Sequence, residues 1–171
     1  MPRTQDISST IYKTLYKGII SLDLMPGQSL KESDLCDAFN ASRTPVRDAV
    51  MRLSESSLVD ILPYKDNRVS YINMKNLKQL IYARAAVEER MIRDFASQDN
   101  DLLLEDMFHA IRRQEIIVTQ KNFEPFEFFD VDREFHRIWY KATNNEAIYD
   151  FFHFHPDYTR LRILEMRIGK D

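Results

Sequence analysis

A helical repeat of apolar residues runs along most of this chain and is interrupted by one short β-rich stretch. Over residues 7–22 the repeat places Ile7, Ile11, Leu15 and Ile19 on one face of a helix. Residues 59–62 and 68–72 are instead β-rich, and the turn-forming residues 63–67 between them predict a hairpin. Only three glycines and six prolines interrupt 171 residues. The chain is therefore predicted to be mainly α.

Two short helices precede the predicted hairpin and lie close together in the sequence. One is indicated over residues 32–39, and the polar break Asn40-Ala41-Ser42 follows it. The next helix is predicted to have Thr44 as its cap and Pro45 at its first position. Its buried face is predicted to consist of Val46, Ala49, Val50 and Leu53. This arrangement predicts a helix-turn-helix, and the hairpin that follows it predicts a wing.

The remainder of the chain is predicted to be an all-helical bundle. Helices are indicated over residues 73–96, 101–120, 123–142 and 146–168. Asn73 suits the cap of the first of them, and Pro156 either kinks the last helix or starts a fresh segment. The boundary near Asn73 predicts two domains, a winged helix-turn-helix at residues 1–72 and a helical effector-binding and dimerisation domain at residues 73–171.

Composition narrows the class of protein. Cys36 is the one cysteine, so an intrachain disulfide is impossible and a reducing compartment is expected. The first residues lack the layout of a signal peptide, and no stretch approaches the roughly 20 apolar residues of a membrane span. A cytoplasmic protein without a membrane partner is therefore expected. The net charge is −3, and residues 1–72 carry nine basic and nine acidic residues. DNA binding must therefore depend on where individual charges lie.

The start of the third predicted helix carries the candidate DNA-binding residues. If its apolar residues are buried, Arg43, Thr44 and Arg47 lie on its outer surface at the N-terminal end. A recognition helix meets base edges at that end, and an arginine fork fits guanine with about 1–3 kcal/mol of discrimination. Ser42 and the free N–H groups of the helix start suit phosphate oxygens. On residue types alone, an ordinary capped helix with solvated arginines explains these positions equally well.

The same region resembles the N-terminal domain of GntR-family regulators in the FadR-like branch. The resemblance is carried by Met25-Pro26-Gly27, Leu30-Lys31-Glu32 and the string from Ser42 to Val50, SRTPVRDAV. It implies that Arg43, Thr44 and Arg47 contact DNA, together with a wing tip near Lys65 to Asn67. Relatives usually have a glycine at the wing tip, whereas this chain has Asp66-Asn67. An aspartate there would be repelled by phosphate, which weakens the predicted wing contact.

The helical half resembles the effector-binding domain called FCD. The matching patterns are Arg84-x-x-x-Glu88, the run Asp132 to His136, and Asn144-Asn145. The resemblance implies that Asp132 and His136 supply two ligands to a divalent metal such as zinc or nickel, and that two histidines of later helices supply the others. The i, i+4 spacing independently places Asp132 and His136 on one helix face, where they can share an ion or form a surface hydrogen bond.

The metal site is expected to be incomplete, because the sequence ends at Asp171 whereas the family's domain usually continues for two or three more helices. On this basis the chain is expected to be a C-terminally truncated family member. His153 and His155 do not match the family's ligand positions and are predicted to lie in a partly buried turn. Arg84 is a candidate for holding an anionic effector, because guanidinium suits carboxylate. A structural salt bridge within the bundle is the alternative.

These patterns together predict a dimeric transcriptional regulator, most simply a repressor, that binds a palindromic operator and responds to a small organic acid. A second hypothesis is a truncated regulator that binds DNA but has lost effector and metal sensing. A third, a helical metal-dependent enzyme centred on Asp132 and His136, is disfavoured because the sequence lacks repeated Glu-x-x-His motifs and a glycine-rich phosphate loop. The chain is expected not to be an enzyme.

Overall fold

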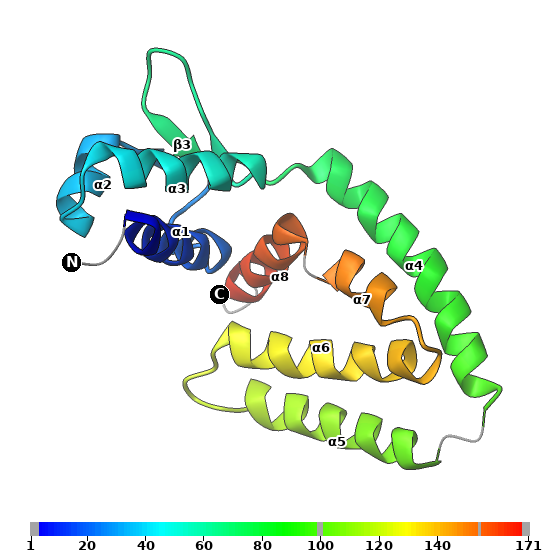
Figure 1. Cartoon of the computed structure of the whole chain (residues 1–171). Coiled ribbons are helices and arrows are strands. Elements are labelled where there is room, and N and C mark those ends of the chain that lie inside the picture. Colours follow the sequence, from blue (N-terminus) through cyan, green and yellow to red (C-terminus); the bar gives the residue numbers. More distant parts are fainter. Residues whose placement is uncertain (1–3, 99–100, 154, 169–171) are drawn as a thin grey trace. The chain divides into compact units, whose positions relative to one another are not determined.

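The computed structural model describes residues 4–98, 101–153 and 155–168. The chain divides into two compact units, Met1–Ile72 and Asn73–Asp171. Helices dominate both units, and a small sheet lies in the first (Figure 1). The predicted mainly helical fold class is therefore confirmed.

The first unit combines three helices with a small antiparallel sheet. Its elements are α1 (Thr4–Ile20), β1 (Ser29–Leu30), α2 (Glu32–Phe39), α3 (Arg43–Glu55), β2 (Val59–Asp60) and β3 (Asn67–Val69). The strand order is β1-β3-β2, with Ser29 opposite Arg68 and Val59 opposite Val69. The predicted hairpin is thus present as β2 and β3. Sequence reasoning missed β1, because a strand of two residues is too short to show alternation.

The apolar faces of α1 and α3 form the centre of the first unit. The residues of these two faces that are buried are Ile11, Leu15, Ile19, Val46, Ala49, Val50 and Leu53. Helices α1 and α3 pack against each other, and the Ser8 hydroxyl of α1 donates a hydrogen bond to the Asp48 carboxylate of α3. Because the apolar face of α3 is covered by α1, its polar face is fixed toward the outside.

Helix α3 starts two residues earlier than predicted. Arg43 is already helical, and Ser42 is the N-cap residue with an extended backbone. Pro45 is therefore not the first helical residue but lies later in the first turn. That position tolerates proline because the N–H groups of the first turn have no acceptor within the helix. Thr44 is correspondingly inside the helix and not its cap.

The wing turns at a different place from the one predicted. Tyr64 has a φ of 60°, so the left-handed residue of the hairpin is Tyr64 and not the predicted pair Asp66-Asn67. Asn67 is instead the first residue of β3, paired with Leu30, and 9% of its surface is exposed. The prediction that Asn67 lies at the wing tip is therefore wrong, because the strand begins one residue earlier than the alternation of residues 68–72 suggested.

Gly27 fixes the turn that leads into β1. Its φ is +83°, and a Cβ at this position would lie 2.5 Å from the hydroxyl of Tyr71. The Gly27 N–H donates to the Val69 carbonyl at 2.8 Å. The turn thus lies directly against β3, and only a residue without a side chain fits there.

The second unit is a helical bundle arranged around α6. Its helices are α4 (Met74–Ala96), α5 (Asp101–Val118), α6 (Pro125–Ala142), α7 (Glu146–His153) and α8 (Pro156–Ile168). Helix α6 contacts α4, α5, α7 and α8, and α5 runs alongside it (Figure 1). The predicted cap is confirmed, since the Asn73 side chain accepts a hydrogen bond from the Asn76 N–H at 3.1 Å. Of the two alternatives for Pro156, the fresh segment is correct.

The interior of the second unit is partly polar. One apolar cluster contains Met91, Phe95, Trp139, Tyr140 and Tyr149, and another contains Ala110, Ile117 and Val131. Arg84, His153 and Arg160 are buried as well, with exposures of 6%, 3% and 0%. Charged and titratable groups are seldom this deeply buried without partners. The partners of Arg84 and His153 define the second candidate site below.

In the part of the chain described, no helix has the length and apolar character required to cross a bilayer.

Candidate functional site

The N-terminal end of α3 presents the predicted recognition residues to solvent. Ser42, Arg43, Thr44 and Arg47 are all exposed. Arg47 Nε donates to both carboxylate oxygens of Glu32 in α2, at 2.9 and 3.1 Å, yet 59% of its side chain remains exposed. An exposed pair of this kind contributes little stability, but it orients the arginine. The N-terminal end of α3 therefore presents polar and cationic side chains to solvent, while the apolar face of the same helix packs against α1 and fixes its position.

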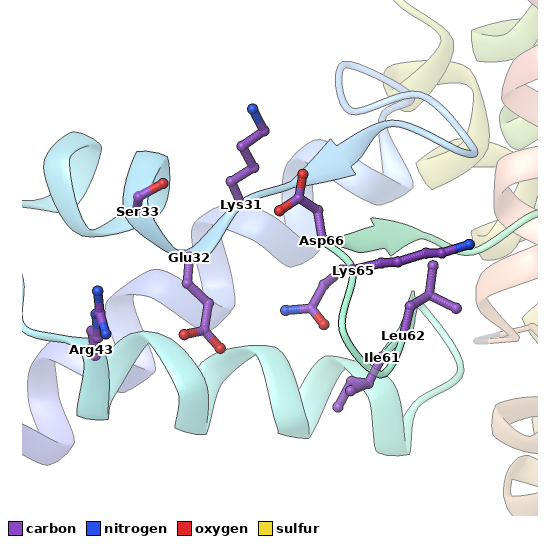
Figure 2. A pocket seen from close by; sticks show the side chains of 9 residues that line it. Lys31, Glu32, Ser33, Arg43, Ile61, Leu62, Lys65 and Asp66 are labelled. Atoms are coloured by element: carbon purple, nitrogen blue, oxygen red, sulfur yellow. The ribbon is translucent and has the colours of Figure 1, made fainter.

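A hollow of about 440 Å³ lies between α2, the start of α3 and the wing formed by β2, β3 and the loop that joins them (Figure 2). Figure 2 shows Arg43 at the start of α3, Ser33 in α2, and Lys65 and Asp66 in the hairpin. The residues that line the hollow are Lys31, Glu32, Ser33, Arg43, Ile61, Leu62, Lys65, Asp66 and Asn67. Sequence reasoning missed Lys31, since the residue before a short helix carries no periodicity signal. The three cations of the hollow come from three different segments: Lys31 precedes α2, Arg43 begins α3, and Lys65 lies in the loop between β2 and β3.

The carboxylates of the same hollow are partly engaged. Glu32 accepts the hydrogen bonds from Arg47, and Asp66 accepts one from the Ser29 hydroxyl at 3.4 Å. Arg43, by contrast, has no ion pair among the residues that the structure describes. Although the first unit has no net charge, its hollow is locally available to an anion, because neither Arg43 nor the wing lysine Lys65 is paired with a carboxylate in the described part of the chain.

A second group of candidate residues lies in the helical unit, where Arg84 and His153 are buried and the others are half-buried. Arg84 Nε donates to Glu88 Oε1 at 2.9 Å, one turn further along α4. Burial alone would lower the pKa of Arg84, but interactions with Tyr158 and Glu88 outweigh it and raise that pKa. Burial alone would raise the pKa of Glu88, but the hydrogen bond with His136 and the charge of Arg84 outweigh it and lower that pKa. The two residues therefore form a charged pair.

Helix α6 contributes His136 and Asp132 beside this pair. His136 Nδ1 lies 3.3 Å from Glu88 Oε1, and both ring nitrogens lie 3.3 Å from Arg84 Nη2. The Asp132 Oδ1 atom lies 3.8 Å from His136 Nε2 and accepts a hydrogen bond from Gln114 at 3.5 Å. The i, i+4 pair is thus brought together, and it lies next to Arg84.

The position of His153 corrects the prediction of a partly buried turn. His153 is the last residue of α7, and its side chain is 2% exposed. Its Nδ1 lies 3.0 Å from the Tyr149 carbonyl oxygen, and its Nε2 lies 3.6 Å from Glu88 Oε1. Burial, followed by the charge of Arg84, lowers the pKa of His153 to about 3. No regular spacing between His136 and His153 in the sequence would predict their meeting. The one available signal was that His153 lies on the same helix face as Tyr149 and Phe152, which are buried.

Glu88, His136 and His153 form a group whose chemistry fits a metal ion. Each offers one ligand atom, and these atoms all lie within 4.8 Å of one another. Two imidazoles and a carboxylate are suitable donors for zinc and nickel. Asp132, predicted as a ligand, lies outside this group and approaches it through His136.

A cavity of about 380 Å³ adjoins the group formed by Glu88, His136 and His153 and is suited to an anion. Its polar lining comprises Arg84, Glu88, His136, Tyr158, Arg162 and Glu165. The Arg84 guanidinium lies over the Tyr158 ring, 4.8 Å from its centre. Both predictions for Arg84, a structural salt bridge and a contact to an anionic effector, therefore fit the geometry, since Arg84 forms a salt bridge and also borders a cavity.

Family models match both units of the chain. The model described as bacterial regulatory proteins of the gntR family matches residues 7–65, and the model of the FCD domain matches residues 79–169. The first match contains α3 and its exposed arginines, and the second contains Arg84, Glu88, His136 and His153. These are the two regions singled out by geometry.

Individual proteins agree with these matches. The chain is 28% identical over 147 residues to the HTH-type transcriptional repressor RspR of Escherichia coli (strain K12), covering 86% of this chain and 64% of that protein. It is 28% identical over 127 residues to an uncharacterised HTH-type regulator of Streptomyces ambofaciens, covering 74% and 52%. The chain thus spans less than two thirds of the length of these relatives.

Solved structures show the same fold. A transcriptional regulator of Rhodococcus sp. RHA1, titled as a GntR protein, superposes with a TM-score of 0.60 at 24% identity, covering 90% of this chain and 72% of that one. Escherichia coli McbR/YncC superposes with a TM-score of 0.57 at 17% identity, covering 92% and 71%. With both units matched by their models, the chain belongs to the GntR family of bacterial transcriptional regulators and carries that family's FCD domain.

Proposed function

We propose that this protein binds operator DNA sequence-specifically through α3 and the wing, and that a small organic acid bound in the helical unit controls this binding. The observation that carries the proposal is the exposed end of α3, where Arg43, Thr44 and Arg47 project from a helix whose other face is buried against α1. A helix held in this way can enter a major groove without rearranging its core.

The polar residues at this end divide into two roles. Arg43 and Arg47 have forks that match guanine O6 and N7, so they are the proposed base-reading residues. Ser42, Thr44 and the wing lysine Lys65 are proposed to contact phosphates, which position the helix without reading sequence. Lys31 joins this second set because it lines the same hollow as Arg43 and Lys65. Glu32 orients Arg47 in the absence of DNA.

The regulator is proposed to act as a homodimer on a palindromic operator. Two winged units related by a two-fold axis would each read one half-site, and the spacing of half-sites follows the helical repeat of DNA. Repression is proposed because the Escherichia coli relative is named a transcriptional repressor. A location in the cytoplasm, where operator DNA is accessible, is part of the same proposal.

The effector is proposed to bind through its carboxylate in the cavity beside Arg84. Two arginines, Arg84 and Arg162, border that cavity, and guanidinium groups bind carboxylates with two parallel hydrogen bonds. A divalent metal, zinc or nickel, is proposed to bind in the same unit, with His136 and Asp132 as the residues that the sequence singles out. Such an ion would supply a positive charge and an open position for the effector's oxygen atoms.

The DNA-binding proposal is tested by measuring affinity for an operator selected from random duplex DNA at fixed salt concentration. We expect Arg43→Ala and Arg47→Ala each to weaken specific binding by about 10- to 100-fold, corresponding to the loss of roughly 1–3 kcal/mol per base contact. Lys13→Ala is the matched control, because it removes one exposed positive charge from α1 in the same unit.

The control separates base reading from general charge attraction. Lys13→Ala should bind the operator within about twofold of the unsubstituted protein, because surface charges away from the DNA contribute little at moderate salt. If both arginine variants bind the selected operator as tightly as the unsubstituted protein, α3 is not the recognition helix.

A further inference from the structure

We infer that Glu32 is a positioning residue for sequence recognition, which holds the guanidinium of Arg47 in the orientation that reads guanine and keeps this contact when DNA is bound. The inference rests on the proposal that Arg47 reads a base. It adds that the base preference of Arg47 depends on a carboxylate carried by the preceding helix. Glu32 itself does not touch the DNA, so it determines specificity through the arginine alone.

The contact between the two side chains uses one particular nitrogen of the arginine. Arg47 Nε donates to Glu32 Oε2 at 2.9 Å and to Glu32 Oε1 at 3.1 Å. A guanidinium carries five N–H groups, one on Nε and the others on its two terminal nitrogens. Within the residues that the structure describes, the terminal nitrogens of Arg47 make no hydrogen bond. Their N–H groups therefore remain available to a further partner.

The nitrogens that remain available are those that fit the edge of guanine. Two hydrogen bonds from one arginine to O6 and N7 distinguish guanine from the other bases in the major groove. An arginine can make them from its end, through Nη1 and Nη2, or from its side, through Nε and one Nη. Because Glu32 occupies Nε, only the approach from the end is available to Arg47. The carboxylate thus selects one of two recognition geometries before DNA arrives.

The backbone that carries Glu32 is fixed relative to α3. Glu32 is the first residue of α2, which packs against α3, and the left-handed Asn40, with a φ of 46°, turns the chain between the two helices. Figure 2 shows the Glu32 side chain directed from α2 toward α3. The Glu32 side chain is 31% exposed, whereas that of Arg47 is 59% exposed. The carboxylate is therefore the sheltered member of the pair, and the arginine is the member that can reach a ligand.

Arg43 provides a comparison within the same helix. It lies four residues before Arg47, is exposed, and has no ion pair among the described residues. Immobilising a long side chain at an interface weakens binding, and for Arg43 this loss of freedom occurs when DNA binds. For Arg47 much of it has already occurred when the protein folds. Removal of Glu32 should therefore affect the base that Arg47 reads and leave the base that Arg43 reads unaffected.

The location of Glu32 also has an electrostatic cost. Glu32 lines the same hollow as Arg43 and Lys65, and a carboxylate there repels phosphates and weakens the attraction to every duplex. Without Glu32, the attraction to DNA in general should increase while the preference for guanine decreases. These opposite signs distinguish a positioning residue from an ordinary surface charge, because removal of an ordinary charge changes only the general attraction.

The test measures binding of the full chain to an operator selected from random duplex DNA and to duplexes in which one base pair of that operator is replaced at a time. Arg43→Ala and Arg47→Ala first identify the base pairs that each arginine reads, as the positions where preference is lost. Glu32→Ala should then reduce the preference at the base pair of Arg47 by about 3- to 10-fold, the effect of immobilising one long side chain. It should leave the preference at the base pair of Arg43 within about twofold, and it should bind random duplex DNA more tightly than the unsubstituted chain.

Three further variants serve as controls. Asp37→Asn removes a negative charge from an exposed site on the same helix and should leave the preference at every base pair unchanged. Glu32→Gln keeps one carbonyl oxygen that can accept from the Nε–H of Arg47, so it should retain more of the guanine preference than Glu32→Ala. Glu32→Ala added to Arg47→Ala should cause no further loss at that base pair, because the side chain that Glu32 positions is already absent.

The outcomes separate this inference from the proposal on which it rests. If Arg47→Ala loses preference at a base pair and Glu32→Ala retains it, Glu32 does not position the arginine, while the base-reading proposal stands. If Glu32→Ala loses preference at a base pair that Arg47→Ala leaves intact, Glu32 reads a base itself and the inference is wrong. Unchanged preference at every base pair in Arg47→Ala would overturn both. The variants should all fold, since an ion pair on the surface contributes little stability.

Discussion

The two units of this protein place their candidate functional groups in opposite ways. In the first unit, the polar residues Ser42, Arg43, Thr44 and Arg47 lie within one stretch of sequence, point outward and are supported by an apolar core. In the second, Arg84, Glu88, His136 and His153 come from three helices; Arg84 and His153 are buried, and Glu88 and His136 are half-buried. An outward-facing surface can change its charges at little cost in stability, whereas an inward-facing cluster must satisfy every group. In the first unit, the candidate functional residues can therefore be substituted with little loss of stability, whereas in the second unit the corresponding residues also stabilise the fold.

This difference is tested most directly by two arginines on the same helix. Arg84→Ala should destabilise the helical unit by about 2–4 kcal/mol, because it removes a buried guanidinium and leaves the half-buried Glu88 carboxylate without its arginine partner. Arg90→Ala breaks the exposed i, i+4 pair with Asp94 on α4 and should cost about 0.5 kcal/mol or less. Urea denaturation followed by the fluorescence of Trp139 measures both effects. Equal losses for the two variants would contradict the assignment of Arg84 as a buried partner of Glu88.

A second prediction concerns the independence of the two units. Leu53 is fully buried in the first unit, so Leu53→Ala should destabilise that unit by about 2–5 kcal/mol. Trp139, the one tryptophan of the chain, is buried in the second unit and should report an unchanged transition. Met51→Ala, at an exposed site on the same helix, is the control and should have little effect. A shift of the Trp139 transition with Leu53→Ala would show that the units unfold together.

The smallest predicted effect is a pH dependence confined to the second unit. The unfolded state protonates His153 near its ordinary pKa of 6.5, whereas the native state does so only near a pKa of about 3. Stability is therefore lost as pH falls below about 6.5, by at most about 1.4 kcal/mol per pH unit for one proton. Glu88, whose pKa is lowered, keeps its own contribution until the pH falls below its ordinary value of 4.5.

The window between pH 6.5 and 4.5 therefore includes the effect of the lowered pKa of His153 and excludes that of Glu88. We expect His153→Gln to flatten the slope of unfolding free energy against pH in this window, measured in metal-free buffer. His109→Gln, at an exposed position, should retain the slope. An unchanged slope for His153→Gln would show that another group accounts for it.

The features of the fold that depend on local sequence were predictable. The apolar repeats of α1, α3 and the helices after Asn73 were recognised because each helix buries one face with a period of 3.6 residues. The Asn73 cap followed from the preference of asparagine for that position. Ends of elements were less predictable: α3 begins two residues earlier than expected, and Tyr64 adopts the left-handed conformation that had been assigned to Asp66-Asn67. Turn geometry depends on strand pairing, which involves residues distant in the sequence.

The sequence by itself determined that α3 carries arginines at one end and an apolar face along its length, because both facts lie within a single helical repeat. It also placed Asp132 and His136 on one face of α6. Only the tertiary structure decided that His153 and Glu88 join His136, that Asn67 lies in a strand, and that Arg84 is buried among them. The reason is physical: a helical period specifies which residues share a face, whereas the meeting of α4, α6 and α7 depends on how whole helices pack.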